Sequence, residues 1–328
     1  MKLASLKDGG RDGTLIVVDR ALTHYVTVPD IAETLQQALD DWAHAAPRLN
    51  AVSEALNLGH SEHSQILDYT ALASPLPRAY EFVDGSAYLP HVERVRRARG
   101  AEVPASFYED PLMYQAVSAG FLGPRDPVAV VSEDYGIDFE AEVIVVTDDV
   151  PMAVSAEQAA DHIQLIGLVN DVSLRNLIPG ELAKGFGFLQ SKPRSALSPV
   201  LVTPDELGEN WQGTVLCLPL RSWLNGERFG DPEAGEDMQF NFAELVAHAA
   251  RTRPLAAGTI VGSGTVANED ESKGASCLAE RRMLEIISGG SPVTPFMSFG
   301  DSIRIEMLDR EGASIFGAIE QVIEPYGR

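Results

Sequence analysis

Apolar residues follow two different periods in the N-terminal part of the chain. Residues 3–6 and 14–18 are apolar runs of strand length that flank a glycine-rich turn, as the two arms of a hairpin do. Residues 31–42 then carry apolar side chains at helical spacing. Asp30 and Glu33 stand three residues apart, as in a capping box. This part is therefore expected to form strands followed by a helix that Asp30 caps.

The rest of the chain is richer in strand-like segments. The proline-containing segment 74–77 is incompatible with a helix, and it separates a small N-terminal α+β domain, residues 1–75, from a larger domain, residues 76–328. Strands are expected in the larger domain at residues 128–131, 142–146, 163–169, 199–202, 214–224, 227–229, 302–308 and 314–322. Helices are expected at residues 155–162 and 241–250. Because no βαβ rhythm is present, the pattern predicts an α+β, mostly β fold.

Charge and cysteine usage narrow the possible roles. Acidic residues outnumber basic ones 48 to 25, for a formal charge of −23. Such a charge repels phosphate backbones and anionic lipids, so no nucleic-acid or membrane partner is expected. Cys217 and Cys277 cannot form a disulfide framework, and the first residues lack the apolar run of a signal peptide. We expect a soluble, cytoplasmic protein.

Three carboxylates adjoin apolar strand-like segments. Glu140 and Glu142 are two residues apart, so on a strand their side chains share a face. A divalent cation would offset their repulsion, because Mg²⁺ and Ca²⁺ prefer oxygen ligands. The alternative is the polar face of an edge strand. Asp171 ends the apolar segment 163–169, where it either caps a turn or serves as a metal ligand.

Two other segments hold candidate catalytic residues. His91 follows Asp84 by seven residues, early in an expected helix. An isolated histidine is more often structural than catalytic. Glu280 precedes two arginines, and surface ion pairs are its simplest interpretation. Taken singly, neither residue indicates a function.

Together, the order and spacing of these segments resemble the fumarylacetoacetate hydrolase family over about residues 75–325. The resemblance rests on the Asp84–His91 interval, the Glu140-Ala141-Glu142 pair, and Asp171 followed by Ser173 and Arg175. It also rests on Lys192, Gly264-Thr265 and Glu280. It implies a rolled, mixed β-sandwich and a homodimer. The implied site binds Mg²⁺ or Ca²⁺, with Mn²⁺ as a further option, through Asp84, Glu140, Glu142 and Asp171.

The resemblance also implies an activity. Substrates of the family are small anionic β-diketo acids, and a hydrolase of this type cleaves a carbon–carbon bond in a fumarylacetoacetate- or acylpyruvate-like molecule. His91 would activate water, Glu280 would orient its ring, and Lys192 would stabilise developing negative charge. Sister chemistries share the metal ligands: decarboxylation or tautomerisation of oxaloacetate, hydration of 2-oxoalkenoates, and isomerisation of diketo acids. A metal-bound binding protein without turnover is a further alternative.

The residues expected around the substrate depart from the family pattern. Ser86 stands where a tyrosine is expected, with Tyr88 as a substitute, and Phe121 replaces a second tyrosine. Ile178 replaces a glutamine, and Gly100 an arginine, for which Arg99 is a nearby substitute. Thr265 completes this expected substrate-binding set. Residues 178–185 are a candidate lid.

Overall fold

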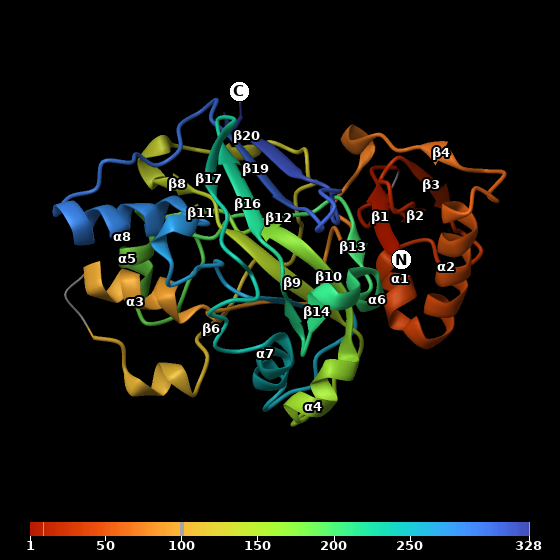
Figure 1. The fold of residues 1–328 in the computed structure, drawn as a ribbon, viewed down its shortest axis with the longest axis horizontal. Coiled ribbons are helices and arrows are strands. Elements are labelled where there is room, and N and C mark those ends of the chain that lie inside the picture. Colours follow the sequence, from red (N-terminus) through yellow and green to blue (C-terminus); the bar gives the residue numbers. More distant parts are fainter. Residues whose placement is uncertain (9, 99–101, 328) are drawn as a thin grey trace.

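The computed structural model describes residues 1–8, 10–98 and 102–327. Among these residues, eleven strands form one mixed sheet that runs through the molecule (Figure 1). Ten of them follow one another in the order β4 (Gln65–Ile66), β3 (His24–Thr27), β2 (Thr14–Val18), β1 (Lys2–Leu6), β13 (Leu201–Val202), β10 (Ile163–Asn170), β9 (Ala141–Thr147), β18 (Ile260–Gly262), β5 (Phe82–Gly85) and β6 (Met113–Gln115). The eleventh, β12 (Ala196–Leu197), pairs with β10.

A second sheet packs against the centre of the first. Its strands are, in spatial order, β17 (Glu227–Gly230), β16 (Leu220–Leu224), β19 (Ser302–Met307), β20 (Ile319–Pro325) and β7 (Val128–Val130). Asn225 and Gly226 join β16 to β17 with φ angles of 52° and 81°, as a type I′ hairpin requires. Two short pairs complete the β structure: β8 (Ile137–Asp138) with β11 (Ser173–Leu174), and β14 (Trp211–Gln212) with β15 (Val215–Leu216).

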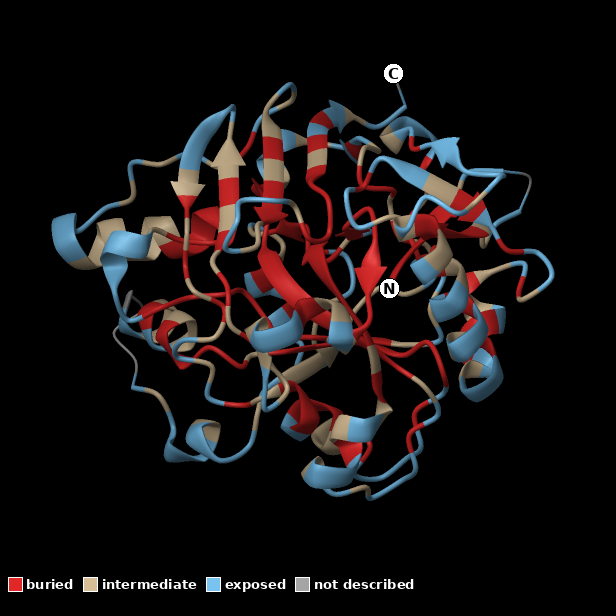
Figure 2. Ribbon diagram, turned by 45° about the vertical axis from the view of Figure 1, so that its right-hand side comes forward, coloured by how far each residue is buried: buried red, intermediate tan, exposed pale blue. Residues whose placement is uncertain are grey.

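The two faces of the central strand β9 belong to different parts of the core. Val143 and Val145 face the second sheet, whereas Ile144 and Val146 pack in the cluster that contains the N-terminal helices. A strand that is covered on both faces has no solvent-exposed side, which explains the unbroken apolar runs of β9 and β10. In Figure 2 these strands lie at the buried centre of the molecule.

The N-terminal segment extends the large sheet, because β1 pairs with β13 through Leu3 and Leu201. Its helices are α1 (Leu35–Asp40) and α2 (Trp42–Asn57). The expectation that Asp30 caps the first helix is wrong. Thr34 is the cap and accepts a hydrogen bond from the Gln37 amide. The amides that Asp30 would cap are already bound, because Ala32 donates to the Val28 carbonyl and Glu33 to the Gln37 side chain.

Two expected strands also differ in extent. Residues 214–224 do not form one strand, because the chain breaks between β15 and β16 at Pro219, which has no N–H to donate to a neighbouring strand. Gly213 and Thr214, both with positive φ, form the turn between β14 and β15. The last strand begins at Ile319 rather than at residue 314, after Gly317 with φ of 72° beside Pro199.

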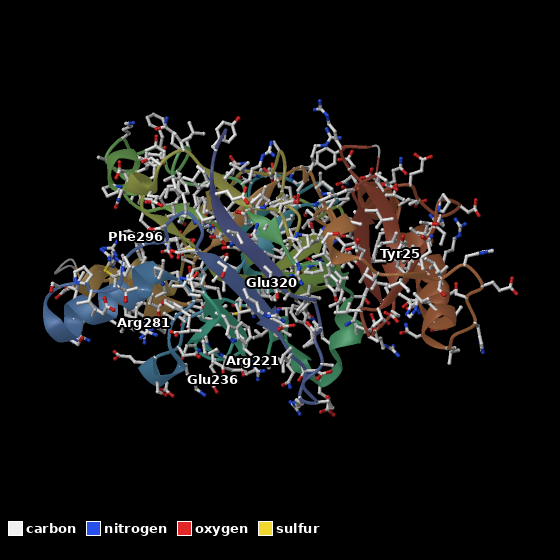
Figure 3. All side chains as sticks on the ribbon, turned by 90° about the horizontal axis from the view of Figure 1, so that it is seen from above. Tyr25, Arg221, Glu236, Arg281, Phe296 and Glu320 are labelled. Atoms are coloured by element: carbon white, nitrogen blue, oxygen red, sulfur yellow. The ribbon has the colours of Figure 1, made fainter. Side chains whose placement is uncertain are left out.

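Helices gather at the end of the molecule opposite the N-terminal segment. They include α3 (Leu89–Ala98), α5 (Ile178–Leu182) and α8 (Leu278–Gly289), and α3 packs against α8. In Figure 3, Arg281 of α8 lies at this end and Tyr25 of β3 at the other. The remaining helices are α4 (Ala156–Ala159), α6 (Pro204–Leu207) and α7 (Phe242–Ala249). The fold is α+β and mostly β, as expected. Among the described helices, none is long and apolar enough to cross a membrane.

Candidate active site

A cavity of about 360 Å³ opens where the ends of β5 and β9 meet α3 and α5. One side of it is polar and the other apolar. Its polar and charged lining residues are Asp84, Ser86, His91, Glu140, Glu142, Arg175, Lys192 and Thr265. Its other lining residues are Gly85, Tyr88, Leu112, Met113, Tyr114, Ile178, Leu182, Gly187, Phe188 and Gly264.

Three carboxylates converge at the base of the cavity. One oxygen from each of Asp84, Glu142 and Asp171 lies within 4.8 Å of the other two. The strand register brings them together, since Gly262 of β18 pairs with Asp84 on one side and with Ile144 on the other. A Cβ atom at Gly262 would overlap the Asp84 carboxylate, so this position leaves room only for glycine.

The Glu142 carboxylate is the clearest sign that this cluster binds a cation. The side chain is fully buried, and within the described chain neither of its oxygens has a hydrogen-bond partner. Burial, and next the charge of Asp84, raise the pKa of Glu142 well above its ordinary value. Burial and the charge of Asp171 likewise raise the pKa of Asp84 to about 7. A hard divalent cation would satisfy these oxygen donors and their charge.

Lys192 provides positive charge beside this cluster. Its Nζ donates to Glu140 Oε2 at 2.5 Å and to Asp171 Oδ2 at 2.6 Å. Burial opposes the ammonium charge, but Asp171 and Glu140 outweigh it and raise the pKa of Lys192. The Tyr114 hydroxyl donates to the same Asp171 oxygen at 2.5 Å, and Ser195 donates to the other at 2.6 Å.

Glu140 differs from Glu142, because both of its oxygens already have partners. Arg175 and Thr265 donate to Oε1 at 2.7 and 2.8 Å, and Lys192 and Ser173 donate to Oε2. Burial alone would raise the pKa of Glu140, but Arg175 and Lys192 hold it below the ordinary value. Glu140 lines the cavity together with Glu142, next to the cluster formed by Asp84, Glu142 and Asp171.

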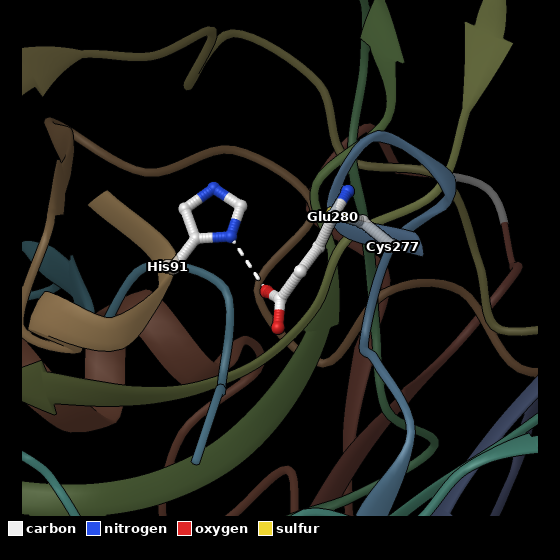
Figure 4. A group of neighbouring side chains, drawn as sticks. All are labelled: His91, Cys277 and Glu280. Atoms are coloured by element: carbon white, nitrogen blue, oxygen red, sulfur yellow. Dashed lines mark hydrogen bonds and ion pairs between the residues drawn. The ribbon is translucent and has the colours of Figure 1, made fainter. Parts of the chain in front are cut away.

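His91 and Glu280 form a hydrogen-bonded pair at the cavity wall. His91 Nδ1 lies 2.7 Å from Glu280 Oε2 (Figure 4). The second oxygen of Glu280 accepts from Arg94 Nη1 at 2.6 Å, and Arg94 also donates to the Asn268 carbonyl. Glu280 is completely buried. An Nδ1–H that donates to Glu280 leaves Nε2 as the basic nitrogen of the ring.

The interpretation of Glu280 as a surface ion-pair residue is wrong. Arg281 stacks on Phe229 and Arg282 donates to the Thr294 carbonyl, so neither neighbour is the partner of Glu280. Glu280 instead sits in the first turn of α8, whose N-terminus is fixed by Asp138. That carboxylate accepts from the amides of Leu278 and Ala279 at 2.7 and 2.9 Å, and packing of α8 on α3 then directs Glu280 to His91.

The structure places some of the expected substrate-binding residues at the cavity and others away from it. Ser86, Tyr88, Ile178 and Thr265 line the cavity, although the Tyr88 hydroxyl donates to the Ala234 carbonyl at 2.7 Å. Phe121 does not line it. Its ring packs on Phe82 with centroids 5.6 Å apart, in the core beneath the N-terminal segment. Arg99 lies outside the described residues.

The sequence interpretation missed several residues of the site. Arg94 is three positions after His91, so the two share a helix face, and this spacing was the available signal. Tyr114 and Phe188 carried no comparable signal, because their approach depends on where β6 and the loop after α5 pack. Their rings meet edge-to-face with centroids 4.8 Å apart.

The loop after α5 is held by one carboxylate. Glu181 accepts hydrogen bonds from the amides of Leu189, Gln190 and Ser191 and from the Ser191 hydroxyl. Despite burial, these bonds lower the pKa of Glu181 to about 2. Ile178, Leu182, Gly187 and Phe188 from this segment border the cavity. The proposed lid over residues 178–185 therefore borders the cavity, and its movement stays a prediction.

Comparisons with known proteins find relatives of several activities. The chain is 28% identical over 167 residues to a 2,4-didehydro-3-deoxy-L-rhamnonate hydrolase of Sphingomonas sp. (strain SKA58), covering 50% of this chain and 55% of that protein. It is 26% identical over 161 residues to a mitochondrial oxaloacetate tautomerase of Xenopus laevis, covering 48% of each. The chain thus spans about half the length of the curated relatives it matches.

Among solved structures, the maleylpyruvate hydrolase of Sphingobium sp. SYK-6, in complex with manganese(II) and pyruvate, has the same fold. The TM-score is 0.64 at 15% identity, with 99% of both chains covered. The family model for the fumarylacetoacetate (FAA) hydrolase C-terminal region matches residues 81–324, and that for fumarylacetoacetase N-terminal domain 2 matches residues 1–78. The chain belongs to the fumarylacetoacetate hydrolase family.

Proposed function

We propose that this chain is a metal-dependent hydrolase that cleaves a carbon–carbon bond in a β-diketo acid of the acylpyruvate or fumarylacetoacetate type. The observation that carries the proposal is the His91–Glu280 pair on the wall of the cavity that also holds the carboxylate cluster. Hydrolysis needs a base for water, whereas a protein that only binds its ligand does not. The proposed base and the proposed cation site therefore border the same cavity.

The base follows from the hydrogen-bond arrangement. Glu280 fixes Nδ1 as the protonated nitrogen of His91, so Nε2 can take a proton from water as its oxygen attacks the acyl carbonyl carbon. Arg94 holds the second oxygen of Glu280, so the carboxylate cannot turn away. When the carbon–carbon bond breaks, the departing carbon keeps the electron pair and His91 returns the proton to it. The products are a carboxylic acid and a 2-oxo acid.

Asp84, Glu142 and Asp171 would hold the divalent cation, with Glu140 as the fourth carboxylate at its side. The cation, when bound, supplies Lewis-acid stabilisation of the enolate that forms on cleavage. Lys192 adds a fixed positive charge at the same place, because Asp171 and Glu140 orient its ammonium group. Its charge is in position before the reaction begins, so no reorganisation is needed when negative charge develops.

The dyad is tested by His91→Gln and Glu280→Gln in the Mg²⁺-loaded protein with an acylpyruvate as substrate. We expect kcat to fall by ~10²–10⁴-fold, the usual contribution of a general base, while the Kd for the cation is unchanged. His162→Gln is the matched control, because His162 Nδ1 lies 2.6 Å from Asp148 in a similar pair that does not border the cavity. Full activity in His91→Gln would refute the role of the dyad.

The tautomerase among the relatives makes enolisation without cleavage the second candidate. Lys192 and Tyr114, which both donate to Asp171, are hydrogen-bond donors that would stabilise an enolate independently of His91. In that case oxaloacetate would tautomerise, acylpyruvates would stay intact, and His91→Gln would leave the rate unchanged. That combination of results would replace the hydrolase proposal.

A further inference from the structure

We propose that the acyl group accepted by this site is uncharged and apolar, and that the cavity discriminates against a substrate with a second carboxylate. The inference rests on the proposed function and names the substrate class within it. It predicts neutral alkanoyl or aroyl pyruvates as substrates, in preference to dicarboxylic diketo acids such as fumarylacetoacetate. Leu182 and Leu112 are the proposed specificity-determining residues.

The cations that border the cavity are already paired. Arg175 donates from Nε to Asp138 at 2.8 Å and from Nη2 to Glu140 at 2.7 Å, so its charge is shared between two protein carboxylates. Lys192 lies between Glu140 and Asp171, and its side chain is 6% exposed. His91 is paired with Glu280. Among the described lining residues, every cationic or histidine side chain thus already has a carboxylate partner.

The charge of the site also opposes a dianion. Four carboxylates, Asp84, Glu140, Glu142 and Asp171, face two cations, Lys192 and Arg175. One divalent cation brings this set to formal neutrality, and Asp138 beside Arg175 adds a further negative charge. The 2-oxo acid end of a substrate can be bound by the divalent cation. A carboxylate at the other end would lose its hydration without gaining a partner, which costs binding free energy.

An apolar part of the cavity lining offers contact instead. It is built from three separate segments: Leu112 and Met113 at β6, Ile178 and Leu182 in α5, and Phe188 in the loop after it. Phe188 is fixed edge-to-face against Tyr114, whose hydroxyl is turned to Asp171. These side chains can bury a hydrocarbon acyl group, and they give no hydrogen bond to a distal carboxylate.

The test compares two acylpyruvates of equal chain length with the Mg²⁺-saturated protein. One ends in a methyl group and the other in a carboxylate. We expect kcat/KM to be ~10²-fold higher for the methyl-terminated compound, the order of discrimination that an apolar pocket shows against an added polar group. Equal or better turnover of the carboxylate-terminated compound would overturn the inference. Loss of that preference in Arg99→Ala would then assign the recognition to Arg99.

A gain-of-function variant keeps the test independent of folding. Leu182 is 46% exposed at the cavity border, so the guanidinium of Leu182→Arg can reach the cavity without being buried. We expect it to raise kcat/KM for the carboxylate-terminated compound at least ~10-fold and to lower it for the methyl-terminated one. Leu58→Arg is the matched control, since Leu58 is 69% exposed at the end of α2.

The failure of this inference differs from failure of the proposed function. If neither compound is cleaved with Mg²⁺ or Mn²⁺ present, the hydrolase proposal fails, and with it the basis of the inference. If both are cleaved at similar rates, or Leu182→Arg leaves the ratio of the two kcat/KM values unchanged, the hydrolase stands and the apolar acyl site is wrong.

Discussion

The substitution Glu142→Gln is expected to weaken cation binding and to leave the stability of the metal-free protein unchanged. The substitution keeps the size of the side chain and removes its charge from a cluster in which three carboxylate oxygens lie within 4.8 Å of one another. At that separation two full charges repel by about 3.5 kcal/mol for an effective dielectric constant of ~20. Burial and the charge of Asp84 raise the pKa of Glu142 well above its ordinary value, which favours a neutral carboxyl in the metal-free protein. A glutamine imitates that neutral form.

The expected result is unchanged stability without the cation and loss of the stabilisation that the cation gives. At a concentration 100 times Kd, a bound cation stabilises the folded state by about 2.7 kcal/mol. For a chain of 328 residues this raises Tm by roughly 4 °C. Thermal unfolding of both proteins, with Mg²⁺ or EDTA, measures the shift. The exposed residue Glu62 provides the control Glu62→Gln, which should retain it.

Two results would refute this reasoning. A rise in Tm with Mg²⁺ that is equal in Glu142→Gln and in the unchanged protein would remove Glu142 from the cation site. A large loss of stability in the metal-free variant would show that Glu142 is charged and paired there.

Three further predictions follow from the geometry. Gly262→Ala should raise the cation Kd at least ~10-fold in a calorimetric titration, because the added Cβ would overlap the Asp84 carboxylate; an unchanged Kd would contradict the tight packing. Asp138→Asn should lower the free energy of unfolding in urea by ~3 kcal/mol, since a buried partner of Arg175 and of the α8 amides is lost, and an effect below 1 kcal/mol would contradict this role. Cation affinity should fall as the pH drops from 8 to 6, because the pKa of Asp84 near 7 lets protons compete, and a flat profile would contradict that.

The carboxylates and the histidine could be found from the sequence, but the links between them came from the resemblance and from no local pattern. The resemblance to the family located Asp84, Glu142, Asp171 and His91, and the family itself is confirmed by the matched models. Their roles stay predictions. Taken alone, Glu280 looked like a surface residue, and only the resemblance paired it with His91, because its burial depends on packing of α8 against α3, a contact between residues 189 apart in the sequence. No local pattern reports such a contact.

Other differences have equally specific causes. Phe121 was assigned to the substrate by its offset in a motif, yet its turn packs on Phe82 and directs the ring into the core. The first helix starts at Leu35 instead of after Asp30, because backbone hydrogen bonds to Val28 occupy the residues between them. Unbroken apolar runs predicted the central strands β9 and β10 well, since both faces of each strand are covered by the core. Caps and loop packing depend on the tertiary structure.

The most direct test of the account follows oxygen from water into the products. The Mg²⁺-loaded protein is incubated with a methyl-terminated acylpyruvate in ¹⁸O-labelled water, and the products are identified by mass spectrometry, with an EDTA-treated control. The account predicts cleavage into two acids that depends on the cation, with one ¹⁸O in the carboxylate of the released fatty acid. An intact, decarboxylated or merely hydrated product in the presence of the cation would contradict it.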